Sequence, residues 1–221
     1  MIVYHGSENI ITKPIYDFRN NSNDYGAGFY TTAHKKLAGE WACRKNNDGF
    51  INRYELDTSG LKICRLNSDE YSILNWLALL TRYRGYWQKH SIAEEAKNYL
   101  QEMFLVDVSS FDIVVGYRAD DSYFSFAQDF ISGVISLECL SIAMRLGDLG
   151  EQTVIKSDRA FDHISYIDSE SAFAELYFQK KTGRDLAARR RYAELKKEMR
   201  YDETFMIDII RGRKTADDIC L

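Results

Sequence analysis

The chain has 221 residues, a length that fits one large domain or one domain with an appendage. Hydrophobic residues make up 45% and charged residues 28% of it, so it can build an apolar core. A net charge of −4 argues against binding nucleic acid through overall charge, although a local basic patch is compatible with it. No apolar run approaches the ~20 residues of a membrane-spanning helix.

The cysteines point to a reducing compartment. Cys43, Cys64, Cys139 and Cys220 form no C-x-x-C pair and no cluster with histidine at zinc-like spacing. The N-terminus starts directly with an apolar, strand-like segment and shows no secretory signal. We therefore expect free thiols in a cytoplasmic protein, and no metal site.

Hydrophobic periodicity and turn residues predict a mixed order of strands and helices. In chain order they predict a strand at 2–4, a loop over 8–23, a glycine-led turn into a strand over 26–32, a helix at 35–45, strands at 50–56 and 61–65, helices at 72–82 and 92–104, a strand at 111–115, helices at 123–132 and 136–146, a turn at 147–150, a strand at 152–156, and a helix from Asp158 through Ile164. Ser136 is the predicted N-cap of its helix.

The composition changes at about residue 169. The segment from there to Arg200 is rich in Ala, Leu, Glu, Lys and Arg, which all favour helices. Ala188, Tyr192, Leu195 and Met199 follow one another at spacings of four, three and four, which predicts an amphipathic helix. We therefore expect an α+β domain over residues 1–168 and a helical C-terminal extension over residues 169–221.

Three short strings carry residue types suited to chemistry. They are Tyr4-His5-Gly6-Ser7, Asp24-Tyr25-Gly26-Ala27-Gly28-Phe29-Tyr30 and Gly150-Glu151-Gln152-Thr153-Val154-Ile155. Each string alone is typical of ordinary structure, because a histidine at a strand end is usually structural and a Gly-x-Gly before aromatic residues is usually a turn. Their order along the chain is what makes them informative.

In this order the strings resemble the ADP-ribosyltransferase superfamily, in its His-Tyr-Glu branch of diphtheria-toxin-like and poly(ADP-ribose) polymerase-like enzymes. The chain looks closer still to a bacterial domain-of-unknown-function family with a His-Tyr-Gln variant of the triad. That likeness includes the string Val115-Gly116-Tyr117-Arg118-Ala119-Asp120-Asp121. The resemblance implies a split β-sheet core over residues 1–168, with helical insertions at 68–108 and 122–147.

The resemblance also implies roles for individual residues. His5 would hydrogen-bond the adenosine ribose of NAD, and Gly6 would hold the nicotinamide amide through its backbone. Ser7 would add a polar contact. Tyr30 would stack on the nicotinamide ring, and Trp41 lies where the polymerases place a second stacking ring, so the two could sandwich it. NAD is then a substrate, and no metal is implied.

The third triad position departs from the active relatives, where a glutamate opens the last strand. Gln152 can accept a hydrogen bond from a ribose hydroxyl, but it offsets a developing positive charge less well than a carboxylate. Glu151 is the alternative residue. Since neighbouring strand residues point to opposite faces, Gln152 is favoured over Glu151.

Other charged residues have both a structural and a functional interpretation. Asp120 and Asp121 fit a turn as well as a substrate site. Arg118 could meet a pyrophosphate, although solvent exposure is the more common fate of an arginine. The basic stretch Arg184 to Arg200 could contact RNA or an acidic partner, but its interspersed acidic residues favour a solvated helix face.

Three functions follow from these observations. The first is an NAD-dependent ADP-ribosyltransferase that modifies a macromolecule, by family analogy as the toxin of a toxin–antitoxin or phage-defence system with a partner antitoxin protein. The second, favoured by Gln152, is a catalytically degenerate module that binds NAD or ADP-ribose. The third is an interaction protein that acts through its helical tail.

Overall fold

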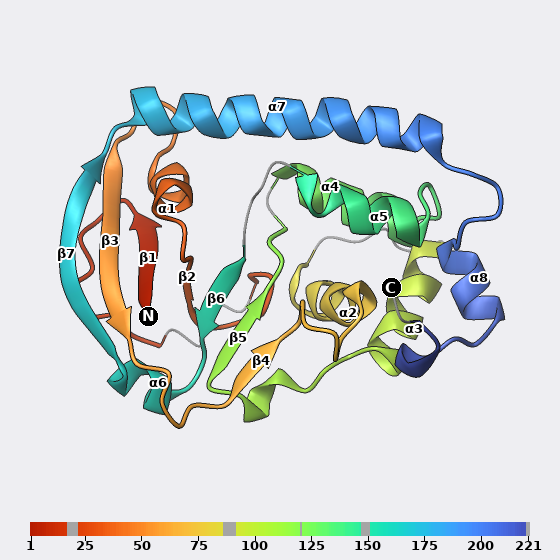
Figure 1. Ribbon diagram of the computed structural model, residues 1–221, viewed down its shortest axis with the longest axis horizontal. Helices are drawn as coiled ribbons and strands as arrows, with labels where there is room; N and C mark the ends of the chain where they lie inside the picture. The colour runs from red at the N-terminus through yellow and green to blue at the C-terminus, as the bar shows by residue number, and fades with distance from the viewer. Residues whose placement is uncertain (17–21, 86–91, 120, 147–150, 220–221) are drawn as a thin grey trace.

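The computed structural model describes residues 1–16, 22–85, 92–119, 121–146 and 151–219 (Figure 1). It has a mixed α+β architecture with two small sheets. The strands are β1 (Ile2–Ser7), β2 (Phe29–Thr31), β3 (Gly49–Leu56), β4 (Ile63–Arg65), β5 (Ile113–Gly116), β6 (Gln152–Ile155) and β7 (Ile164–Ala172). The α-helices are α1 (Lys35–Ala42), α2 (Ile73–Tyr83), α3 (Ile92–Met103), α4 (Asp121–Ile131), α5 (Leu137–Ala143), α6 (Asp158–Asp162), α7 (Ala174–Glu198) and α8 (Met206–Arg211).

The two sheets meet near the N-terminus. One is antiparallel with the order β1-β3-β7, and the other has the order β2-β6-β5-β4 with β4 and β5 parallel. Tyr4 and Thr32 join them through two backbone hydrogen bonds of 2.8 and 2.9 Å. Beyond this bridge, β2 pairs with β6 instead of continuing along β1. A seam therefore opens between β1 and β2.

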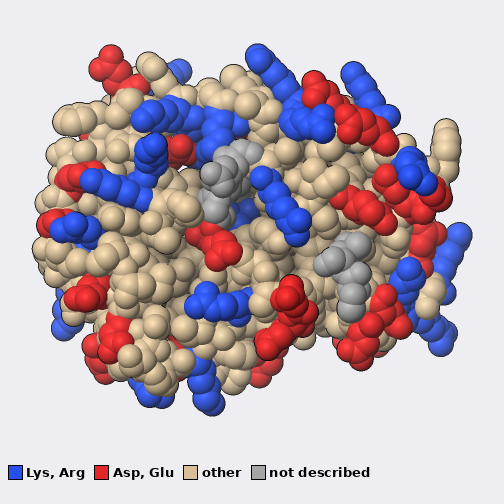
Figure 2. Space-filling view, in the orientation of Figure 1, with Lys and Arg blue, Asp and Glu red and all other residues tan. Residues whose placement is uncertain are grey.

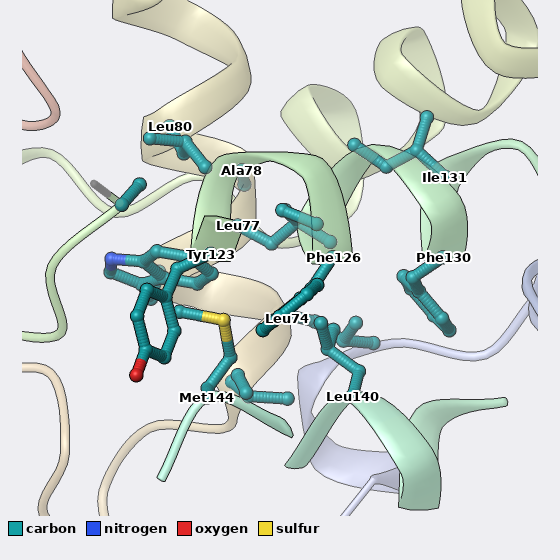
Figure 3. Close-up of a cluster of buried hydrophobic side chains, with 14 of the residues drawn as sticks. Leu74, Leu77, Ala78, Leu80, Tyr123, Phe126, Phe130, Ile131, Leu140 and Met144 are labelled. Atoms are coloured by element: carbon teal, nitrogen blue, oxygen red, sulfur yellow. The ribbon is translucent and has the colours of Figure 1, made fainter. Parts of the chain in front are cut away.

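Helices fill the two predicted insertion segments. The segments α2 with α3 and α4 with α5 lie between β4 and β6 in sequence and pack into one apolar core (Figures 1 and 3). Leu77, Phe126 and Leu140 are buried there, one from each of three helices. Ser136 accepts a hydrogen bond from the Cys139 N–H, which confirms it as an N-cap. The four helices predicted in these two segments are therefore present, with ends that differ from the prediction by up to three residues.

Helix α7 runs along one whole side of the molecule, from the end of β7 across α4 and α5 (Figure 1). Ala188, Tyr192 and Leu195 are buried on its inner face, as the spacing predicts, and Met199 packs against the same core. Its outer face carries interleaved basic and acidic side chains along the top of Figure 2. No helix in the described part of the chain is both long enough and apolar enough to span a membrane.

The predicted helix from Asp158 through Ile164 is wrong in its second half. Helix α6 ends at Asp162, and the chain then enters β7, which pairs with β3 along the whole length of that strand. Ile164 and Tyr166 face a small apolar cluster, whereas the residues around them are exposed and mostly polar. Because β7 lies at the edge of its sheet, most of its residues are exposed, and its sequence does not show the apolar alternation that predicts a strand. The predicted domain boundary at residue 168 lies inside β7. The helical C-terminal segment begins after this strand, at Ala174.

Candidate functional site

A cleft of about 400 Å³ lies at the seam between the two sheets. It contains His5 of β1, Tyr30 of β2 and Gln152 of β6, three residues that are far apart in the sequence. Its full lining is His5, Ile11, Ile15, Asn23, Asp24, Gly28, Phe29, Tyr30, Trp41, Arg84, Arg118 and Gln152. The spatial convergence expected of His5, Tyr30 and Gln152 is therefore present.

His5 is fixed by the strand across the seam. Its Nδ1 lies 2.7 Å from the Tyr30 carbonyl oxygen, and its ring packs on Phe29 with a centroid distance of 4.5 Å. A carbonyl oxygen only accepts hydrogen bonds, so Nδ1 carries the proton and Nε2 of the neutral ring is an acceptor. Burial lowers the pKa of His5, and the Tyr30 hydrogen bond offsets part of that shift. His5 can therefore receive a hydrogen bond from a ligand hydroxyl.

Tyr30 is locked onto the turn that precedes it. Its hydroxyl donates to the Gly26 carbonyl at 2.6 Å and accepts from the Tyr25 N–H at 3.1 Å. Gly26 has a φ of 75°, which favours glycine, and Lys156 holds the same turn through the carbonyls of Tyr25 and Ala27. Burial raises the pKa of Tyr30 well above its ordinary value. Tyr30 therefore offers the cleft a ring surface and not an ionisable group.

Gln152 is held by two acceptors. Its Nε2 donates to the Asp24 carboxylate at 2.8 Å and to the Tyr117 carbonyl at 3.0 Å. Both partners only accept, so the orientation of the amide follows from the network and both of its N–H hydrogens are engaged. The residue is 4% exposed. Gln152 therefore presents a fixed, neutral amide to the cleft.

Glu151 directly precedes β6 and does not line the cleft. It is exposed, accepts a hydrogen bond from Asn67, and borders a separate hollow with His34 and Arg65. Alternation along the strand therefore places Gln152 in the cleft and Glu151 outside it, as predicted.

Gly6 and Ser7 do not line the cleft as expected. A Cβ on Gly6 would lie 1.8 Å from the Ala38 carbonyl oxygen, so close packing of β1 on α1 requires the glycine. Ser7 donates to the Asn9 carbonyl and accepts from Asn52, contacts that shape the following loop. The backbone of Gly6 still points to the β2 side of β1, because Tyr4, two residues earlier, bonds Thr32 there.

Trp41 lines the cleft beside Arg118. The Arg118 guanidinium lies 4.3 Å from the centre of the indole, so it covers one face of the ring. Contrary to expectation, Arg118 is only 2% exposed, and burial together with the nearby Arg184 charge lowers its pKa to about 9. Arg184 of α7 in turn forms an ion pair with Glu40 of α1. The C-terminal helix therefore supports the back of the cleft.

Two charged residues of the cleft carry no distinctive sequence signal. Asp24 is 7% exposed, and its Oδ1 lies 3.1 Å from Arg84 Nε while its Oδ2 accepts the Ala119 N–H at 2.9 Å. Asp24 lies within one of the three strings, but an aspartate before a glycine turn is usually a turn residue. Arg84 follows the last residue of α2, in a segment without a motif.

The remaining predicted features lie elsewhere or cannot be placed. Asp120 and the side chain of Asp121 are outside the described residues, as is Cys220. Cys43, Cys64 and Cys139 are buried free thiols. Within the described ranges, no three His, Cys, Asp or Glu side chains are grouped so that they could hold a metal ion.

Comparison with known proteins gives a family and no activity. Among curated proteins and among solved structures, none matches the chain. The family model described as a protein of unknown function, DUF3990, matches residues 1–166. This range includes every residue that lines the cleft and ends before α7. The match spans well over half of the chain, and the protein therefore belongs to the DUF3990 family.

Proposed function

We propose that the cleft binds NAD and that the protein is an ADP-ribosyltransferase acting on a macromolecule. The observation that carries this proposal is the meeting of His5, Tyr30 and Gln152 at one seam between two sheets. We infer that the two sheets correspond to the split β-sheet of that superfamily, with β1, β2 and β6 contributing one triad position each.

The cleft has the size of a small-molecule site and a surface that suits NAD. A volume of about 400 Å³ lies within the ~300–1,000 Å³ of small-molecule sites. Tyr30 and Trp41 offer aromatic surface to the nicotinamide ring, and the locked hydroxyl of Tyr30 leaves stacking as its role. The neutral His5 ring offers Nε2 to a ribose hydroxyl. Gly6 offers backbone N–H and C=O groups on the same side of β1.

The charge of the cleft suits a pyrophosphate. Among the described residues that line it, Arg84 and Arg118 are basic and Asp24 is acidic, so the ionised side chains leave a net positive charge. A guanidinium matches the geometry of phosphate oxygens. Arg118 is also held in place by its stacking on Trp41, so it needs little further ordering to bind a ligand.

In the reaction, the bond between the ribose C1′ and the nicotinamide nitrogen breaks. Both electrons go to that nitrogen, which leaves neutral, and positive charge develops on the ribose. A nucleophile of the acceptor then attacks C1′ and its proton passes to solvent. The side chains described here bind and orient NAD for this step and exclude water from one side of it.

Incubation of the full chain with labelled NAD tests the proposal. We expect release of nicotinamide and transfer of label to protein or nucleic acid, with both lost in His5→Ala and Gln152→Ala. If expression is toxic to the host cell, Tyr30→Ala should relieve the toxicity. Asn98→Ala, on the remote surface of α3, is the matched control and should behave like the wild type. Absence of any response to NAD in the wild type would overturn the proposal.

A binding module without turnover is the second candidate. The observation that favours it is the neutral amide of Gln152, with both N–H hydrogens engaged, where active members of the superfamily that the chain resembles carry a carboxylate. This candidate predicts that NAD raises the melting temperature of the protein while no nicotinamide is released. Measuring both quantities on the same sample separates the two functions.

A further inference from the structure

The proposed reaction develops positive charge on the ribose, and the following inference rests on that function. A preorganised negative charge beside such a centre is usually a large catalytic contribution. Position 152 carries a neutral amide, so the charge must come from another residue of the cleft if the protein turns NAD over.

Asp24 is the one acidic side chain among the described residues that line the cleft. It is 7% exposed, and it touches Gln152 directly, with 2.8 Å between the carboxylate Oδ2 and Nε2. The Ala119 N–H and the Arg84 guanidinium hold the same carboxylate from two other directions. Its position is therefore fixed before any ligand arrives.

The same contacts explain why residue 152 is a glutamine. Its two N–H hydrogens point at the Asp24 carboxylate and the Tyr117 carbonyl, which are both acceptors. A glutamate at this position would place a second carboxylate against the first and remove one of the three donors to the Tyr117 carbonyl, which also accepts from the Tyr25 hydroxyl and the Trp76 indole N–H. Asp24 and Gln152 thus form one matched pair, in which the charge and the amide depend on each other.

We propose that Asp24 is the catalytic carboxylate of this cleft and that Gln152 is the residue that positions it. Asp24 comes from the turn before β2, so the negative charge reaches the ribose from that turn and not from the start of β6. During cleavage of the C1′–N bond, the carboxylate offsets the charge that remains on the ribose and undergoes no change of its own bonds.

Substitution of Asp24 by asparagine tests this assignment. Asp24→Asn keeps size and removes the charge, so we expect kcat for nicotinamide release to fall about 100-fold while KM for NAD stays within about threefold. Asp112→Asn is the matched control. Asp112 is 9% exposed, and its carboxylate accepts from Ser157 and the Lys62 N–H, but it does not line the cleft, so kcat should be unchanged.

Exchanging the pair gives a second, independent test. Gln152→Glu alone brings two carboxylates together and should lower kcat, whereas Asp24→Asn with Gln152→Glu restores one carboxylate and one amide in contact. We expect the exchanged variant to exceed both single variants in kcat by about tenfold. This comparison also holds if Asp24→Asn is poorly folded.

The outcomes separate this inference from the proposed function. Wild-type protein that cleaves NAD while Asp24→Asn cleaves it equally fast would overturn the role of Asp24 and leave the function standing. A loss confined to KM, or an exchanged variant no better than the single ones, would also overturn it. Wild-type protein that binds NAD without cleaving it would overturn both the transferase activity and the role of Asp24.

Discussion

In the helical layer, formed by α2, α3, α4 and α5, the buried side chains are mostly apolar, whereas the cleft is lined by the buried polar side chains of Asp24, Arg118 and Gln152. Apolar contacts between α2, α4 and α5 need only shape to fit (Figure 3). Each polar group in the cleft instead needs a partner, because burial without one is costly. We therefore expect the first region to contribute most of the stability and the second to recognise the proposed ligand, and substitutions should separate the two.

The largest effect is expected in the helical layer. Phe126 is 1% exposed and stacks on Tyr192 of α7 with a centroid distance of 3.9 Å. Phe126→Ala should lower the free energy of unfolding by about 3–5 kcal/mol in urea titrations, and Phe126→Leu by only about 1 kcal/mol. Where Phe126→Ala is still folded, its affinity for NAD should stay within about twofold. Loss of NAD binding by the folded variant would contradict the separation.

The next largest effect is expected at the ion pair between Arg184 and Glu40, which links α7 to the side of the cleft. Arg184 and Glu40 are largely buried, with side-chain exposures of 17% and 9%. Arg184→Ala leaves the Glu40 carboxylate buried without this partner, so we expect a loss of about 3 kcal/mol in the free energy of unfolding. Because Arg184 also lies near Arg118, NAD affinity should change in the same variant. Glu40→Gln with Arg184→Met should recover most of the stability but not the affinity.

A pH dependence is expected from the cleft. Burial places the pKa of folded His5 below the ordinary value of 6.5. Below pH 6.5 the unfolded chain therefore binds a proton at His5 that the folded protein does not. As the pH is lowered from 6.5 towards the folded pKa, the free energy of unfolding decreases by up to ~1.4 kcal/mol per pH unit. Denaturation at several pH values should show this slope in the wild type. An identical slope in His5→Gln would show that another group causes it.

The smallest effect is expected on the outer face of α7. Arg191 is exposed and pairs with Glu194 and Glu198 at 3.1 Å, three and seven residues further along. Exposed ion pairs of this kind contribute little, so Arg191→Ala should change the free energy of unfolding by less than about 0.5 kcal/mol. NAD affinity should be unchanged. A large loss of affinity for an RNA or an acidic protein in this variant would assign the basic stretch a binding role.

Much of the fold was predictable because its elements carry clear local patterns. The helices of the helical layer were predictable from the spacing of their leucines and phenylalanines. The side chain of Ser136 caps the start of its helix, as its residue type predicts. Strand β7 was missed because it lies at a sheet edge, where most of its residues face solvent and lack an apolar alternation. Hydrophobic patterns predict an element only where its side chains are buried on one face, and β7 is only partly buried.

The cleft was predictable in part. The order of motifs identified His5, Tyr30 and Gln152, and strand alternation chose Gln152 over Glu151. Gly6 and Ser7 are absent from the described lining of the cleft, because Gly6 packs closely on α1 and the Ser7 hydroxyl is engaged by the loop that follows β1. Asp24, Arg84 and the burial of Arg118 depend on contacts between distant segments, which one sequence does not reveal.

A crystal structure of the full chain soaked with NAD tests the central claim most directly. We predict density for the dinucleotide in the cleft, with the nicotinamide ring on Tyr30 and the pyrophosphate near Arg118. We also predict that the nicotinamide ribose lies within contact of the Asp24 and Gln152 side chains. At a saturating NAD concentration, an empty cleft or a dinucleotide bound to another surface would contradict this claim.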